Sequence, residues 1–584
     1  MTISYREMIF LTFGGSRAQI GYDFSAKEFA CGRKGPREAL MRMTTGQGPA
    51  LCAVFRSIIV AAPLWLAACG GGGGAPAADN GWLQFTPASV QVQAYQGESA
   101  SFRVTATSSR TISDPLQIGV IDNKGVLAAG GQILALDKLT YQATLQTSAG
   151  LATGIYEGNL EVRLCRDEPV TCANPYPGSP WQVPYRIEVA PSTNLTPLSP
   201  QAGVVGWTAY QGGAAHTGYV PGSVNPAALG RRWVRTMGPN GQVLNPAVVD
   251  GGRVFVTVSN MSSTSAPRAL IALSEEDGQE LWSDSHDWTE VQGFSPPTVA
   301  QGRVFVGALT LTGNWTWTLR SYDPVSGQAL AQSTMRGSGL SMPMGPTGYG
   351  DSVYAPATTG TTRHLAVDAT QTWASAVGNV TGFITPAVDG GAVYVYTDDR
   401  LVVLDPASGG TRSTIVDTGY VSNTAFMSSA PVLGGGGRVY ATSYGSVADG
   451  SYGGRLLAFD TTLGSVAWTV AERFQSNAVL VGSTLYVVND RRLQARDADT
   501  GTLLWQWTPA GPAVQPTGPN TPLLVVGQHA FVGLNGKTFA VDLQTHQSTW
   551  SYPFQGSLAA SAQGVLYIVV NAGLNPRLHA INLL

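Results

Sequence analysis

The sequence predicts an all-β protein in which a small β-sandwich precedes an eight-bladed β-propeller. Three observations support this prediction. The chain of 584 residues contains 71 Gly and 35 Pro, which indicates frequent turns. Short runs of β-branched and aromatic residues lie between those turns. After residue 240, one pattern of four such runs recurs to the end of the chain.

The charge balance narrows the class of partner. Only 12% of the residues are charged, and the net charge is −3. Binding to nucleic acid depends on clustered Lys and Arg side chains that neutralise phosphates. We therefore expect no nucleic acid partner.

The beginning of the chain predicts export. Residues 1–40 are charged and irregular, and we interpret them as an over-extended start outside the fold. Residues 41–69 carry an apolar run of about a dozen residues, which suits a signal peptide and is too short to span a bilayer. A buried helix is the alternative, but the glycines at 70–74 would end such a helix. We expect a signal peptide over 41–69 and a Gly-rich tether over 70–80.

The last residues of this segment, Leu66-Ala67-Ala68-Cys69, resemble the lipobox of bacterial lipoproteins. The resemblance implies that Cys69 is lipidated, becomes the first mature residue and anchors the chain to a membrane. Gly70 stands where the aspartate associated with inner-membrane retention would be. The implied location is the outer membrane, facing the periplasm, with surface display left open.

Cysteine usage agrees with export. Cys31 and Cys52 precede the expected cleavage point and Cys69 is the expected anchor, which leaves Cys165 and Cys172. An even pair in an oxidising compartment predicts a disulfide closing the short loop "LCRDEPVTC". Two unpaired thiols are the alternative.

Residues 81–191 predict the sandwich. The stretches "SVQVQAYQGE", "ASFRVTATSS" and "WQVPYRIEVAP" alternate apolar and polar residues with period two, and turn residues separate them. The stretch from "GIYEGNLEVRLC" to "WQVPYRIEV" resembles the end of bacterial Ig-like domains. We find no catalytic constellation there and expect a spacer, followed by a polar linker over 192–203.

The repeat after residue 240 has four parts. They are a proline-led strand such as "TPAVDGG", a run such as "VYVYT", a run usually ending in aspartate such as "LVVLD", and an outer strand that often carries tryptophan. We expect the tryptophans to pack between blades and the aspartates to accept hydrogen bonds from turn amides. The tryptophans are Trp282, Trp373, Trp468, Trp505 and Trp550, and the aspartates are Asp405, Asp460, Asp497 and Asp542.

Eight such units follow one another, and the eighth ends after its third strand. The missing outer strand is predicted upstream, at residues 229–236, with Trp233 in the tryptophan position. Pairing of 229–236 with 578–584 would close the ring and remove two exposed sheet edges. The predicted propeller therefore extends over residues 204–584.

The repeats resemble PQQ-type repeats, and "GWTAYQGGAAHTGYV" at 206–220 is similar to the segment that leads into such propellers. The architecture is similar to that of the BamB-type assembly lipoproteins. This resemblance implies a role in envelope assembly, with envelope proteins or peptide segments as partners. PQQ-type propellers also include redox enzymes, so the fold alone leaves the function open.

A PQQ- and Ca²⁺-dependent quinoprotein dehydrogenase is therefore one alternative. Resemblance to those enzymes implies a vicinal disulfide beside the cofactor, but no cysteine follows Cys172 and no C-x-x-C-H haem motif is present. The six histidines are dispersed, and we expect His216 in the leading segment to be structural. We predict a non-enzymatic protein with no catalytic residue, metal site or cofactor.

Loop length distinguishes the two ends of the expected ring. Connections between second and third strands, and between blades, are the longer ones, and we call their end the long-loop face. Function tends to lie on loops that a rigid frame carries. Aromatic or Met residues near this face form a candidate binding rim: Phe294, Trp315, Trp317, Met342, Phe383, Phe426, Phe474 and Phe554.

Two further alternatives concern this face. The rim side chains could instead pack inside the channel and under the blades. Exposed Trp and Tyr side chains could also stack on sugar rings, which would make the protein a glycan-binding surface lipoprotein.

Overall fold

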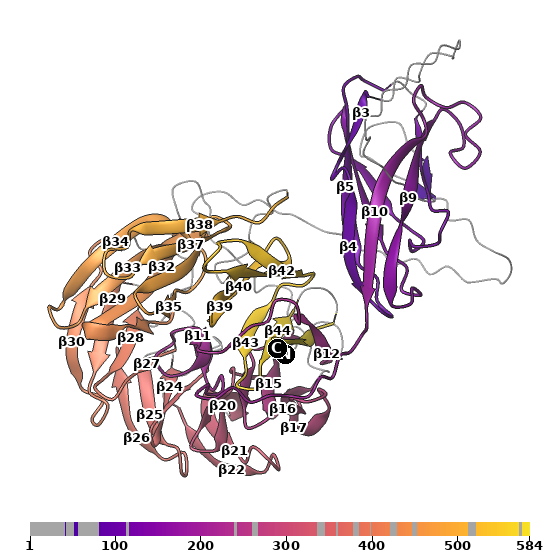
Figure 1. Ribbon diagram of the computed structural model, residues 1–584. Helices are drawn as coiled ribbons and strands as arrows, with labels where there is room; N and C mark the ends of the chain where they lie inside the picture. Colours follow the sequence, from indigo (N-terminus) through magenta and orange to yellow (C-terminus); the bar gives the residue numbers. More distant parts are fainter. Residues whose placement is uncertain are drawn as a thin grey trace, which may run out of the picture.

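The computed structural model describes most of the chain, in two folded bodies (Figure 1). The described residues are 41–42, 52–55, 81–112, 116–238, 242–259, 267–312, 314–335, 345–357, 360–377, 385–397, 399–420, 429–446, 452–511, 521–571 and 575–584. Within these ranges, no helix has the length and apolar character needed to cross a bilayer. Cys69, the expected tether and most of the expected signal peptide lie outside the described residues.

The first body is a β-sandwich whose two sheets share one apolar core. In β10 (Trp181–Ala190) every second residue from Trp181 to Val189 is buried, as the predicted alternation requires. One sheet has the order β3 (Leu83–Thr86), β5 (Ser101–Ser108), β8 (Thr140–Gln146) and β7 (Gln132–Ala135). The other has the order β1 (Met41–Arg42), β2 (Cys52–Phe55), β6 (Gln117–Ile121), β9 (Gly154–Cys165), β10 and β4 (Val90–Tyr95).

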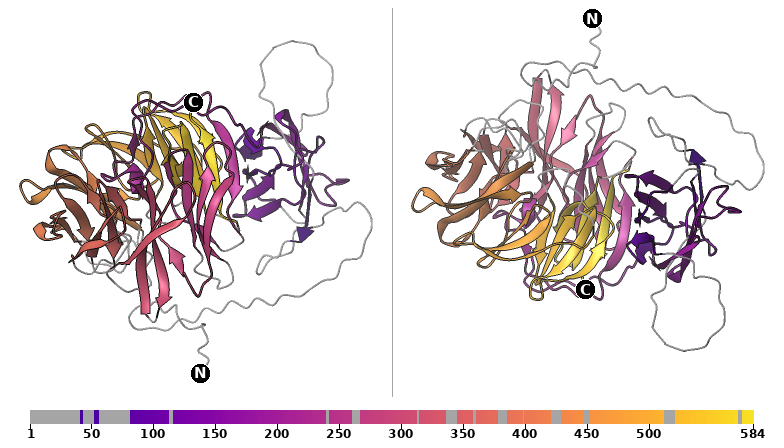
Figure 2. Two further views of the ribbon diagram at one scale, coloured as in Figure 1. Left: turned by 90° about the horizontal axis from the view of Figure 1, so that it is seen from below. Right: turned by 90° about the horizontal axis from the view of Figure 1, so that it is seen from above.

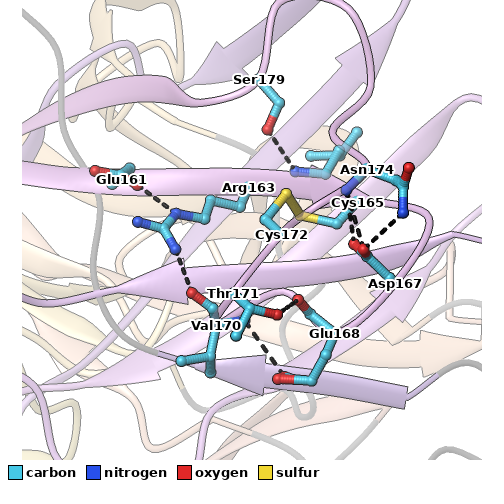
Figure 3. The surroundings of a disulfide bond; sticks show 11 residues. Glu161, Arg163, Cys165, Asp167, Glu168, Val170, Thr171, Cys172, Asn174 and Ser179 are labelled. Atoms are coloured by element: carbon cyan, nitrogen blue, oxygen red, sulfur yellow. Dashed lines mark hydrogen bonds and ion pairs between the residues drawn. A yellow bond between two sulfur atoms is a disulfide. The ribbon is translucent and has the colours of Figure 1, made fainter.

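The disulfide predicted in the sandwich is present. Cys165 and Cys172 are bonded, with their Cα atoms 5.4 Å apart (Figure 3). The loop between them is also fixed by Asp167, whose carboxylate accepts hydrogen bonds from the backbone and side-chain nitrogens of Asn174. Cys165, Asp167 and Cys172 are the one metal-like grouping among the described residues, but the disulfide uses both sulfur atoms.

The second body is a ring of eight blades that follow one another along the chain (Figures 1 and 2). Blades 1 to 4 form its first half. Blade 1 contains β14 (Val248–Asp250), β15 (Arg253–Ser259), β16 (Arg268–Ser274) and β17 (Glu280–His286), with β13 (Val243–Leu244) added to β15. Blade 2 contains β19 (Thr298–Ala300), β20 (Arg303–Thr312), β21 (Asn314–Tyr322) and β22 (Ala329–Thr334), with β18 (Gly293–Phe294) added to β20. Blade 3 contains β23 (Thr347–Tyr349), β24 (Ser352–Ala357), β25 (Gly360–Leu365) and β26 (Gln371–Ala376). Blade 4 contains β27 (Ala387–Val388), β28 (Val393–Thr397), β29 (Arg400–Leu404) and β30 (Thr411–Val416).

The other four blades complete the ring. Blade 5 contains β31 (Val432–Leu433), the 3-10 turn η2 (Gly435–Gly437), β32 (Arg438–Ser446), β33 (Tyr452–Asp460) and β34 (Ser465–Phe474). Blade 6 contains β35 (Val479–Val481), β36 (Thr484–Asn489), β37 (Arg492–Asp497) and β38 (Leu503–Trp507). Blade 7 contains β39 (Leu523–Val526), β40 (His529–Leu534), β41 (Lys537–Asp542) and β42 (Ser548–Tyr552), with β11 (Tyr219–Val220) parallel to β39. Blade 8 contains β43 (Ser557–Ala560), β44 (Val565–Val570), β45 (Arg577–Asn582) and β12 (Gly230–Thr236).

Blade 8 joins the two ends of the propeller sequence. Its outer strand β12 pairs antiparallel with β45, and Trp233 lies opposite Ala580. Trp233 is 1% exposed and belongs to the same apolar core as β44 and β45. In Figure 2 the magenta strand from early in the propeller accordingly lies beside the yellow C-terminal strands.

Tryptophan and glycine form a repeated contact between neighbouring blades, as predicted for the tryptophans. Trp282 of blade 1 donates from Nε1 to the Pro324 carbonyl of blade 2, 3.0 Å away. Gly327 in that turn has φ +72°, and a Cβ there would lie 2.5 Å from the indole. We call this contact a Trp–Gly lock. Three further locks join Trp233 with Gly278, Trp373 with Gly409, and Trp468 with Gly501.

The repeat aspartates organise turns, as predicted. Asp405 accepts hydrogen bonds from the backbone N–H groups of Ala407 and Ser408. The hydrogen bond from the Ser408 backbone, together with Arg412, lowers the pKa of Asp405 to about 2. Asp460, Asp497 and Asp542 accept turn amide hydrogen bonds in the same way.

A buried arginine connects the sandwich to the propeller. Arg231 on β12 is fully buried and donates two hydrogen bonds to the Glu98 carboxylate, at 2.6 and 3.1 Å. Its guanidinium lies 3.6 Å from the Tyr95 ring, and its Nε donates to the Tyr552 hydroxyl. Tyr95 is 4% exposed and packs in the core of blades 7 and 8. The sandwich is therefore docked against the ring at the end of β4, beside blade 8.

Candidate functional site

The long-loop face carries the connections between the second and third strands of each blade and those that run from the outer strand of one blade to the inner strand of the next. Several of its longest connections lie partly outside the described residues, at 260–266, 336–344, 378–384, 421–428 and 512–520. One expected long loop proved to be strand. β20 and β21 continue as a paired hairpin as far as Thr312 and Asn314, because "TLTGNWTWT" alternates residues of high β propensity.

The structure places the predicted rim residues in three groups. Phe294 and Phe474 are fully buried and Trp317 is 3% exposed, so burial favours the packing alternative for these three side chains. Phe554 is partly buried against Tyr552 and His579. Met342, Phe383 and Phe426, and the side chain of Trp315, lie outside what the structure describes.

The glycan alternative required exposed aromatic side chains. Among the described residues, no tryptophan belongs to the exposed large hydrophobic side chains. Most of the described aromatic rings lie within and between blades, whereas Tyr349, at the end of β23, is 41% exposed.

Residues 207–220, which we call the central segment, line the inside of the ring. Their backbone carbonyls accept hydrogen bonds from the inner strands of successive blades. The pairs, donor first, are Val249 with Trp207, Val299 with Thr208, Val388 with Ala214, Leu433 with Ala215, Leu480 with Thr217, and Val525 with Gly218. The segment therefore contacts blades 1, 2, 4, 5, 6 and 7 in that order.

His216 supplies the contact to blade 3, in the structural role predicted for it. The side chain is fully buried, with Nε2 3.3 Å from the Thr347 hydroxyl and Nδ1 3.1 Å from the Pro431 carbonyl. Desolvation by burial lowers the pKa of His216 to about 4. The imidazole is therefore neutral at physiological pH and occupied by these two contacts.

A cavity of about 310 Å³ lies between the central segment and the beginnings of the inner strands. Prolines that precede inner strands form much of its wall, at Pro246, Pro296, Pro297 and Pro522. Because these residues come just before β14, β19 and β39, the cavity lies toward the long-loop face. The other lining residues are Trp207, Ala209, Tyr210, Gln211, Ala247, Val248, Asn477, Thr521, Leu523, Ser557 and Leu558.

The polar side chains in this cavity are all uncharged. Gln211 donates from Nε2 to the Ala478 carbonyl at 2.9 Å, and Asn477 donates from Nδ2 to the Tyr210 hydroxyl. Burial raises the pKa of Tyr210, so its hydroxyl stays protonated. The cavity therefore offers apolar and proline surface with a few amide and hydroxyl groups.

The family model for outer membrane protein assembly factor BamB matches residues 192–448 and 400–565. The chain belongs to the BamB family. Comparison with curated proteins gave no match. The matched residues form the propeller, which is the larger of the two folded bodies. The match begins at residue 192, after the last strand of the sandwich.

Several solved structures match this chain at low sequence identity. BamB from Moraxella catarrhalis is 16% identical, with a TM-score of 0.45, over 61% of this chain and 99% of that one. Quinohemoprotein alcohol dehydrogenase from Comamonas testosteroni is 13% identical, with a TM-score of 0.39, over 64% and 80%. Hsv2 from Kluyvelomyces marxianus is 11% identical, with a TM-score of 0.34, over 54% and 99%. Similarity at this level carries no argument about function.

The cavity residues of this BamB-family chain do not fit PQQ with Ca²⁺. PQQ is a tricarboxylate and requires cationic partners, while Ca²⁺ requires several carboxylate or carbonyl oxygens. Among the described residues, the cavity lining contains no Arg, Lys, His, Asp or Glu. We therefore derive no redox step through this site.

The sequence does not predict the cavity, although its prolines stand at recognisable positions in the repeat units. The prolines were recognised only as the beginnings of repeat units, and their position at the mouth of the channel follows from that register. Asn477 stands at the proline position of the sixth unit and Ser557 directly precedes the eighth, but neither residue type predicts a cavity wall. Their place in the wall depends on how the central segment crosses blades 6 and 8.

Proposed function

We propose that this protein is a non-enzymatic scaffold, lipid-anchored at Cys69 on the periplasmic side of the outer membrane. Its long-loop face binds extended polypeptide segments during outer-membrane protein assembly. Membership of the BamB family supports the assembly role, and the lipobox-like sequence at 66–69 supports the anchor.

The observation that carries the proposal is the uncharged cavity of about 310 Å³, lined by prolines, at the long-loop end of the channel. An extended polypeptide exposes alternating apolar side chains and unpaired backbone amides. Apolar side chains match the surfaces of Pro246, Pro522 and Leu558, and the amide side chain of Asn477 supplies a polar contact. The central segment fixes the cavity wall through backbone hydrogen bonds, so little ordering is needed on binding.

Filling the cavity tests this function. Ser557→Trp places a large side chain in the wall, and we expect it to weaken binding of a urea-unfolded outer-membrane β-barrel protein at least about tenfold. Binding would be measured by fluorescence anisotropy of the labelled, unfolded barrel protein. Leu463→Trp is the matched control, since Leu463 is 78% exposed on a turn of blade 5. Equal affinities for both variants, with unchanged melting temperatures, would reject the cavity as the binding site.

A further inference from the structure

The two ends of the sandwich differ in their surroundings. At one end, Tyr95 on β4 and Ala190 on β10 lie side by side, and the chain passes into the propeller. At the other end lies Trp82, directly before β3. The Ser109 backbone donates to the Trp82 carbonyl at this end, and the Ser108 backbone donates to the Leu139 carbonyl. The turn between β7 and β8 therefore lies beside the point where the chain enters the sandwich.

Exposed leucines gather at this turn. Leu134 and Leu136 are both 51% exposed, and Leu139 is 36% exposed. We call these three residues the apolar tip. β7 is the edge strand of its sheet. Ile133, between the core and the tip, is 6% exposed, so the strand directs one side chain into the core and its neighbours outward.

Charged side chains of both signs surround the apolar tip. Lys138 lies in the turn, and the Arg110 guanidinium lies 4.0 Å from the Trp82 ring. Asp137 is also in the turn, and Asp167 and Glu168 lie in the disulfide loop at the same end. Since neither sign dominates among these side chains, apolar contact rather than net charge would have to hold a partner at the tip.

The length of chain before Trp82 indicates that the apolar tip can reach the bilayer that holds Cys69. Residues 70–80 separate Cys69 from the sandwich, and a segment of this length reaches at most about 40 Å when fully extended. A Gly-rich coil of the same length has a root-mean-square span of about 20 Å. An acylated Cys69 therefore keeps the apolar tip within about 40 Å of the bilayer surface, whatever else the protein binds.

We propose that the apolar tip of the sandwich rests in the headgroup region of the bilayer in which Cys69 is anchored. This inference depends on the lipid anchor that forms part of the proposed function. β9 contains 12 residues, so a sandwich standing on its tip holds the propeller about 40 Å from the membrane. The buried pair of Arg231 and Glu98 at the opposite end then fixes the direction in which the long-loop face points.

An environment-sensitive fluorophore tests this contact. The mature lipidated protein carrying Leu136→Cys would be labelled with NBD and reconstituted into protein-free vesicles of phosphatidylethanolamine and phosphatidylglycerol. We expect a blue-shifted emission and quenching by nitroxide-labelled lipids. The same protein carrying Leu463→Cys on blade 5 is the control, and its probe should behave as in water. Raising the salt concentration should leave the Leu136 signal unchanged, because apolar contact is little affected by screening.

Flotation of the vesicles separates the two possible failures. If the protein floats with the vesicles but probes at 136 and 463 emit alike, the tip contact is overturned and the anchor stands. If the protein does not float, the anchor is overturned and the tip contact falls with it. A blue shift that disappears at high salt would also overturn contact through leucines and would indicate electrostatic attraction by Lys138 and Arg110.

Discussion

Two junctions between neighbouring blades of this propeller differ, and the difference shows what the repeat contributes. Between blades 1 and 2, Trp282 lies on Gly327 and donates to the Pro324 carbonyl. Between blades 4 and 5, Ser413 occupies the tryptophan position opposite Val403, and a Cβ at Gly464 would meet nothing within 4 Å. Both glycines have positive φ, at +72° and +67°. The positive φ therefore favours glycine in both turns, whether or not an indole packs on it. Packing of the indole on the glycine is a second, separate role of the same residue.

The lock that also closes the ring gives the largest expected effect. Trp233→Ala should lower the free energy of unfolding by about 3–5 kcal/mol, since it removes a fully buried indole and leaves the Glu275 carbonyl without the indole N–H. Calorimetric melting of the mature protein measures the loss. Trp373→Ala is the matched variant, because Trp373 forms a lock without closing the ring and is 8% exposed. An equal loss in both variants would show that closure adds nothing to the lock.

Alanine at the turn glycines gives an intermediate effect. In Gly327→Ala the new Cβ would lie 2.5 Å from the Trp282 indole, so the two blades must separate. Overpacking of this kind costs about 1–3 kcal/mol in addition to the backbone cost of about 1 kcal/mol. Gly464→Ala should show the backbone cost alone. The difference between the two melting temperatures measures the steric part of the lock, and equal melting temperatures would contradict the model of two roles.

Building a new lock gives the smallest effect, and in the opposite direction. Ser413→Trp places an indole opposite the open Gly464 and should stabilise the protein by about 1 kcal/mol. The gain should disappear when Gly464→Ala is added, as a double-mutant cycle of melting temperatures would show. A lower melting temperature for Ser413→Trp alone would mean that blades 4 and 5 are spaced differently from the locked pairs.

Repetition explains how much of the fold the sequence predicts. Trp282, Trp373 and Asp405 recur in register, so local periodicity was enough to place each of them on its strand or turn. The β20–β21 hairpin lies where the length between repeats predicts a loop, and only the alternation of residues within it indicates strand. Phe294, Trp317 and Phe474 were placed near the correct end of the ring, but period alone does not distinguish a buried side chain from an exposed one.

The contacts that escaped prediction join segments far apart in sequence. Arg231 and Glu98 are 133 residues apart, and neither belongs to a recognisable motif. Asn477 and Tyr210 meet in the cavity across 267 residues, because the central segment crosses the ring there. Such pairs depend on how the sandwich packs against the ring and on how the central segment crosses it. Neither arrangement leaves a local pattern in a single sequence.

The pairing of β12 with β45 has a consequence for biosynthesis. β12 is synthesised before β45, with the other seven blades between them in the sequence. Until β45 is available, β12 presents an unsatisfied edge that can pair with other chains. The ring therefore closes only after its last blade has been made.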